Sequence, residues 1–143
     1  MKKLLLTLLA TIFIVISAFS QTYIGHSKEY IMKDIGSEYI KNFTYADSGV
    51  LSLTFTDNHT AVYVFDDELC IYYILIYNKT YLQRAVEIAN GAAYKYGDFR
   101  WYLTQDGNYV YIKINSASKS DAIFMNFFLL EYENDVDNIL SAF

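Results

Sequence analysis

The segment that most constrains the fold is a nine-residue apolar run, Leu69 to Tyr77, rich in isoleucine and tyrosine. β-branched and aromatic residues favour extended backbone, so the run predicts a β-strand. No charged residue interrupts it, and a strand of this kind is covered on both of its faces. We therefore expect this strand to lie in the interior of a sheet, with other elements packed above and below it.

Alternating patterns around this run predict further strands. Leu51, Leu53 and Phe55 alternate with polar residues, and the segment 60–65 alternates in the same way. Short polar turns join these strands to the apolar run, which predicts an antiparallel meander. The segments expected to be strands are 39–43, 50–56, 60–65, 69–77, 99–103, 109–115 and 122–132. The first is a weak signal, and the last is ambiguous between strand and helix, with its aromatic content favouring strand.

Amphipathic spacing predicts two main helices, at residues 27–35 and 79–93, with Ser27 and Asn78 as their N-caps. Residues 134–143 form a third, short candidate helix. Together these elements predict an α+β fold, in which a single antiparallel sheet of five to seven strands carries the two main helices on one face. No internal repeat is visible in the sequence, so one domain is expected.

The first twenty residues have the order of a secretory signal peptide. Lys2 and Lys3 precede an uncharged run over residues 4–16, and small residues at 18 and 20 follow. A transmembrane anchor is the alternative, but thirteen helical residues span only about 20 Å of a hydrocarbon core about 30 Å thick. We predict residues 1–20 as a signal peptide, cleavage between Ser20 and Gln21, and residues 21–143 as a single periplasmic or extracellular domain without stable membrane insertion.

Composition excludes several classes of function. Without Lys2 and Lys3 the chain keeps nine basic and sixteen acidic side chains, a net charge of −7. Phosphate neutralisation needs a basic face, so nucleic acid is not an expected partner. A single cysteine excludes a disulfide scaffold and a Cys-x-x-Cys zinc site. No phosphate-binding loop or cofactor motif is found, and no cofactor is predicted.

A family resemblance rests on element order and a few residues. The segment 21–143 resembles the small exported α+β proteins of unknown function of Gram-negative bacteria. Gly25-x-Ser27 before Ile31, Ile35 and Gly36 is similar to the start of small outer-membrane-assembly lipoproteins and of β-lactamase-inhibitor-like domains. The helix–meander–helix order resembles the half-repeat of the TATA-box-binding-protein fold. The acylated cysteine of the lipoproteins is missing, and no functional residue is carried over from these families.

Candidate catalytic and metal-binding residues are few. His26 and His59 lack the spacing that places two ligands on one face, and we interpret both as solvated loop histidines, with no metal site. Cys70 lies within the apolar run, where a thiol is unreactive; the alternative is a nucleophile paired with His59, because the two residues lie on adjacent predicted strands or their turns. The acidic turns lack the pattern of a calcium loop and are expected to form a solvated rim. No catalytic residues are predicted, and the protein is not expected to be an enzyme.

Tyrosine is the unusual component, with fifteen residues in the chain. Alternation places Arg100 and Tyr102 on one face of their strand and Trp101 on the other, and Tyr109 and Tyr111 share a face. We expect Trp101 to be buried under the helix 79–93 and the other four to form a candidate binding surface. Exposed tyrosine is suited to contacts with protein or sugar.

The function predicted from these features is an exported, non-catalytic binding module that recognises a protein or a glycan through a tyrosine-rich sheet face. A structural component of an envelope complex is the alternative, and a hydrolase that uses loop carboxylates is a weaker one.

Overall fold

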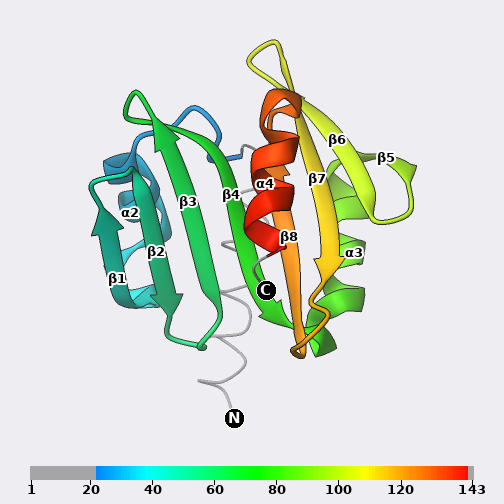
Figure 1. Cartoon of the computed structure of the whole chain (residues 1–143), viewed down its shortest axis with the longest axis horizontal. Helices are drawn as coiled ribbons and strands as arrows, with labels where there is room; N and C mark the ends of the chain where they lie inside the picture. Colours follow the sequence, from blue (N-terminus) through cyan, green and yellow to red (C-terminus); the bar gives the residue numbers. More distant parts are fainter. Residues whose placement is uncertain (1–21, 142–143) are drawn as a thin grey trace.

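The apolar run forms the longest strand of the molecule, β4 (Leu69–Asn78), inside a single antiparallel sheet (Figure 1). The computed structural model describes residues 22–141, so the predicted signal peptide, 1–20, lies outside the described residues. Within these residues the sheet has eight strands, in the order β1-β2-β3-β4-β8-β7-β6-β5. The expected class, α+β with one antiparallel sheet, is confirmed.

Two four-stranded meanders build the sheet. The first comprises β1 (Ile40–Ala46), β2 (Val50–Phe55), β3 (Thr60–Asp66) and β4. The second comprises β5 (Tyr94–Gly97), β6 (Arg100–Gln105), β7 (Asn108–Ser116) and β8 (Ala122–Phe128). The last strands of the two meanders pair with each other, with Tyr73 opposite Phe127 and Ile76 opposite Phe124. A helix precedes each meander, so the same order of elements occurs twice without a visible sequence repeat.

The expected count of five to seven strands is wrong, because the sequence pattern at residues 94–97 predicts the end of a helix where the structure has the strand β5. The backbone is already extended at Ala93, and Tyr94 and Lys95 pair with Tyr102 and Trp101 of β6. The ambiguous segment 122–132 divides into strand β8 and a short 3₁₀ turn, Leu130–Tyr132.

Both expected N-caps form, but the α-helix that follows Asn78 begins only at Leu82, after a 3₁₀ turn. The Oγ of Ser27 accepts a hydrogen bond from the Tyr30 backbone N–H at 3.2 Å, at the start of α2 (Lys28–Ile35). The Oδ1 of Asn78 accepts one from the Thr80 N–H at 3.0 Å, before a 3₁₀ turn that leads into α3 (Leu82–Ala92). A third helix, α4 (Glu133–Leu140), closes the described chain. None of the helices within residues 22–141 has the length and apolar content to span a membrane.

The two main helices lie on one face of the sheet, as expected, and a third helix lies on the other face. α2 and α3 cover one face and contribute Ile31 and Ala89 to the large core. α4 lies across the other face, in front of the sheet in Figure 1, and its Val136 packs with Tyr72 and Phe128. Successive strand residues point to opposite faces, so β4 needs cover on both sides.

Trp101 occupies the position predicted for it. Its side chain is 0% exposed and belongs to the same core cluster as Ala85 and Ala89 of α3. The indole Nε1 donates a hydrogen bond to Oδ1 of Asn90, also on α3, at 2.9 Å. The burial of Trp101 under α3 is therefore confirmed, and it orients Tyr102 toward the opposite face of β6.

Candidate functional site

The four residues of the predicted binding surface lie on the hairpin of β6 and β7. Tyr102 pairs with Tyr111, Arg100 with Lys113, and Thr104 with Tyr109. Tyr111 packs with the residues under α4, so these side chains occupy the α4 face of the sheet. The tertiary structure thus brings the three predicted tyrosines together.

Two further tyrosines join them from the edge strand β5. Tyr94 lies opposite Tyr102 in the β5–β6 ladder, and Tyr96 contacts both Tyr102 and Tyr111. The alternation Tyr94-Lys95-Tyr96 is the sequence signal for this strand, but its position directly after a helical pattern predicts the end of that helix instead. We name the resulting set the tyrosine surface. It consists of Tyr94, Tyr96, Tyr102, Tyr109 and Tyr111.

Tyr102 is the centre of the tyrosine surface. Its ring centroid lies 5.6 Å from that of Tyr94, 6.0 Å from Tyr96, 5.8 Å from Tyr109 and 6.5 Å from Tyr111. Tyr109 meets it edge-to-face at 72°, and Tyr96 meets Tyr111 at 83°. These are the separations and tilts that aromatic pairs prefer, so each ring restrains its neighbours.

The rings nevertheless remain open to solvent. Tyr94 is 70% exposed, Tyr109 57% and Tyr96 50%, whereas Tyr102 and Tyr111 are half-buried among them. Isolated exposed apolar side chains are ordinary, but a contiguous group indicates an interaction site. The tyrosine surface therefore combines exposed apolar area, hydroxyl groups and restrained side chains.

Charged groups border the tyrosine surface on the side of α4. Partial burial raises the pKa of the Tyr96 hydroxyl, the Arg100 guanidinium opposes that shift, and Glu133 at the start of α4 adds to it. Nζ of Lys113 forms an ion pair with Oδ1 of Asp137 at 3.2 Å, which ties β7 to α4. Arg100 is exposed beside the rings, and its side chain interacts with the Tyr96 hydroxyl.

The structure separates the residues considered for catalysis and metal binding. Cys70 lies opposite Phe65 at one end of the β3–β4 ladder, and His59 lies beyond Thr60, which pairs with Ile76 at the other end. A strand rises about 3.3 Å per residue, so Cys70 lies roughly 20 Å along β4 from Ile76, at the end of the ladder next to His59. Burial raises the pKa of the Cys70 thiol well above its usual range, which disfavours the reactive thiolate.

The two histidines also lie far apart. The backbone carbonyl of His26 accepts a hydrogen bond from the N–H of Cys70 at 2.9 Å, which places His26 at the end of the ladder away from His59. Residues 22–141 contain no group of three or more metal-ligating side chains. His59 is only 9% exposed, so its interpretation as a solvated turn residue is wrong.

Comparisons of the chain with protein-family models, with curated proteins and with solved structures found no match. The resemblances noted from the sequence therefore stay predictions.

Proposed function

We propose that this protein is exported and acts as a binding module, which recognises a protein partner through the tyrosine surface. The observation that carries the proposal is the contiguous group of five rings centred on Tyr102. The charged, apolar and small-residue order of residues 1–20 supports export.

Side-chain entropy favours binding by rings that are already restrained. A free side chain that becomes ordered on binding costs roughly 0.5–1.5 kcal/mol, and this cost is smaller for rings that already restrain one another. Tyrosine has two rotatable side-chain bonds and a large contact area, which makes it an efficient contact residue. The ring contacts of Tyr102 therefore favour a surface that is ordered before the partner arrives.

The chemistry favours a protein over a glycan. Tyrosine and arginine are among the residue types that most often dominate the binding energy of protein interfaces. Arg100 stands exposed beside the rings and offers charge-assisted hydrogen bonds to a carboxylate or carbonyl group. A glycan ligand and a structural role in an envelope complex are the alternatives that the experiment must distinguish.

Site-specific photocrosslinking in the producing cells tests the proposal. A photoreactive phenylalanine analogue at Tyr109 should give a discrete crosslinked species, and the same analogue at Lys33, exposed on α2, should not. Tyr102→Ala should abolish the crosslink because it removes the ring that contacts the other four. Tyr102→Phe keeps that ring and should retain most of it.

The outcomes separate the candidates. Equal crosslinking at residues 109 and 33, or a crosslink that survives Tyr102→Ala, contradicts recognition through the tyrosine surface. Purified protein that captures a glycan from an array, with loss in Tyr102→Ala and no protein crosslink, favours the glycan. A matched substitution, Tyr30→Ala, removes a tyrosine of 43% exposure from α2 and should change neither result.

A further inference from the structure

The edge strand β1 lies at the side of the sheet away from the tyrosine surface. Among the described strands, β1 and β5 are the outermost, so each has a neighbouring strand on one side only (Figure 1). An unpaired strand edge is a template for pairing with another chain, and proteins usually protect it with charges, bulges or a short length. The protection of each edge therefore indicates which of the two accepts a partner.

Strand β5 is protected in this way, whereas most of β1 is not. β5 has four residues and a bulge after Lys95, whose side chain is charged. β1 has seven residues, and its bulge lies at the start of the strand. The stretch that follows, residues 42–46, is uncharged and exposed throughout, with Phe43 54% exposed and Tyr45 45% exposed. We name residues 42–46 the open edge.

Residues of β2 form hydrogen bonds alternately with β3 and with β1. The N–H of Phe55 donates to the carbonyl of His59 at 2.9 Å, on the side of β3. Leu51 and Leu53 have the same orientation as Phe55, because they are separated from it by two and four residues. Ser52, which lies between them, therefore bonds to β1.

The open edge consequently directs two sets of backbone groups away from the sheet. Thr44 lies opposite Ser52, so the N–H and C=O of Thr44 point toward β2. The residues on either side, Phe43 and Tyr45, then point theirs in the opposite direction, where no strand of the described chain lies. The side chains of these two residues are on the face covered by α2, because their partners in β2 belong to the large core.

The residues along β1 are complementary to those of a second copy of the same strand. An antiparallel pair with Phe43 opposite Tyr45 brings the outward backbone groups of both copies together. The same register places Lys41 of each copy opposite Asp47 of the other, and both of these residues are exposed. Aromatic pairs and opposite charges directly across a ladder stabilise it. With Phe43 or Tyr45 opposite itself, the charged residues face aromatic ones instead, so the first register is favoured.

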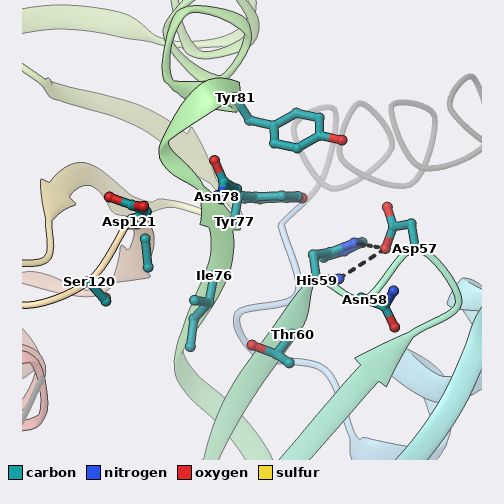
Figure 2. A pocket seen from close by; sticks show the side chains of 11 residues that line it. Asp57, Asn58, His59, Thr60, Ile76, Tyr77, Asn78, Tyr81, Ser120 and Asp121 are labelled. Carbon is teal, nitrogen blue, oxygen red and sulfur yellow. Dashed lines mark hydrogen bonds and ion pairs between the residues drawn. The ribbon is translucent and has the colours of Figure 1, made fainter.

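Lys41 has no carboxylate in its hydrogen bond within the chain. Its Nζ donates to Oδ1 of Asn58 at 3.3 Å, in the β2–β3 turn that Figure 2 shows beside His59. The amide of Asn58 is neutral, so this contact does not neutralise the charge of the amine. A carboxylate from a second copy supplies the missing countercharge.

We propose that two copies of this chain associate through β1, antiparallel and about a two-fold axis at Thr44, so that their sheets join into one. A two-fold contact uses the same surface of both copies, and each copy has one open edge, so the assembly closes at two chains. β5 stays at the outer side of each copy, and both tyrosine surfaces remain accessible on the same face of the joined sheet. This inference does not rest on the proposed function.

Sedimentation velocity of protein purified after expression of the full-length chain tests the association. Between about 1 and 300 μM, the mass should rise from one chain to two, with a Kd in the micromolar range of small interfaces. Phe43→Lys places a charge in the open edge and should raise the Kd at least tenfold. Leu130→Lys is the matched control, because Leu130 is 59% exposed and lies outside β1, and it should leave the Kd unchanged. Far-ultraviolet circular dichroism checks that both variants are folded.

Introduced cysteines test the register independently of affinity. Cys70 is buried, so a new thiol in the open edge is the accessible one. In the proposed register the two copies of Thr44 form a non-hydrogen-bonded pair with Cα atoms about 4.5 Å apart, within the range of disulfides. Thr44→Cys should therefore give a covalent dimer with oxidised glutathione. Asn42→Cys and Ala46→Cys should each cross-link slowly alone and rapidly when mixed, because residue 42 of one copy lies opposite residue 46 of the other.

Three results would overturn the proposal. The first is a parent protein that sediments as one chain at every concentration, or whose mass grows beyond two chains. The second is a folded Phe43→Lys variant with the Kd of the parent protein. The third is cross-linking of Asn42→Cys or Ala46→Cys alone as fast as in their mixture. None of these results bears on the photocrosslinking at Tyr109, which lies on the hairpin of β6 and β7.

Discussion

Removal of the Trp101 side chain tests the core arrangement most directly. The indole is 0% exposed between β6 and α3, so its deletion leaves a cavity that the sheet cannot close. Truncation of a fully buried tryptophan to alanine costs about 3–5 kcal/mol, and domains are typically stable by about 5–15 kcal/mol. We expect Trp101→Ala to lose much of the free energy of unfolding.

The hydrogen bond of the indole to Asn90 is one part of that loss. Asn90→Ala removes the acceptor and keeps the ring, so it should cost about 1 kcal/mol. The difference from Trp101→Ala, about 2–4 kcal/mol, then measures the packing of the ring. Trp101→Phe keeps part of this packing and should fall between the two variants, which gives a measurable value if the alanine variant does not fold.

Urea unfolding followed by far-ultraviolet circular dichroism measures these variants without relying on the tryptophan. Tyr109→Ala is the control, because its side chain is 57% exposed, and it should change stability by no more than about 0.5 kcal/mol. In the parent protein, the emission of Trp101 should be blue-shifted and resistant to acrylamide quenching. A cost below about 1 kcal/mol for Trp101→Ala, or red-shifted emission, would refute the burial of Trp101 under α3.

Two further predictions concern the backbone and the buried tyrosines. Gly49 and Gly107 both have a positive φ, but a Cβ at Gly49 would lie 2.8 Å from the Phe65 carbonyl oxygen, whereas one at Gly107 meets nothing within 4 Å. In urea unfolding, Gly107→Ala should cost about 1 kcal/mol and Gly49→Ala clearly more; equal costs would contradict the close approach at Gly49. Burial raises the pKa of Tyr63 and Tyr73 well above 10, so the folded state keeps protons that the unfolded chain releases. The free energy of unfolding should therefore not depend on these two tyrosines below about pH 10. Above that pH it should fall by up to about 1.4 kcal/mol per pH unit for each tyrosine. A urea unfolding midpoint that rises with pH above about pH 10 would contradict this prediction.

The candidate sites were predictable to different extents. The faces of Trp101 and Tyr102 follow from strand alternation, which is a local property of the sequence. The contribution of Tyr94 and Tyr96 depended on recognising β5, a short edge strand that follows a helix directly. The environment of His59 was not predictable in this way, because its burial comes from Phe55 and from Tyr77, which lies on another strand.

The sequence by itself determined the local elements, because the signals that specify them lie within a few residues of each other. The apolar run fixed a strand covered on both faces, and Ser27 and Asn78 fixed where two helical segments begin. Tertiary structure decided which strands pair. Alternation of apolar and polar residues shows which face of a strand is buried, but it does not show which strand lies beside it. The tertiary structure placed β8 beside β4. Tertiary structure also placed α4 on the second face of the sheet. The amphipathic pattern of α4 predicts that one side of the helix is buried, but not which surface covers that side. The contacts of Val136 with Tyr72 and Phe128 show that surface.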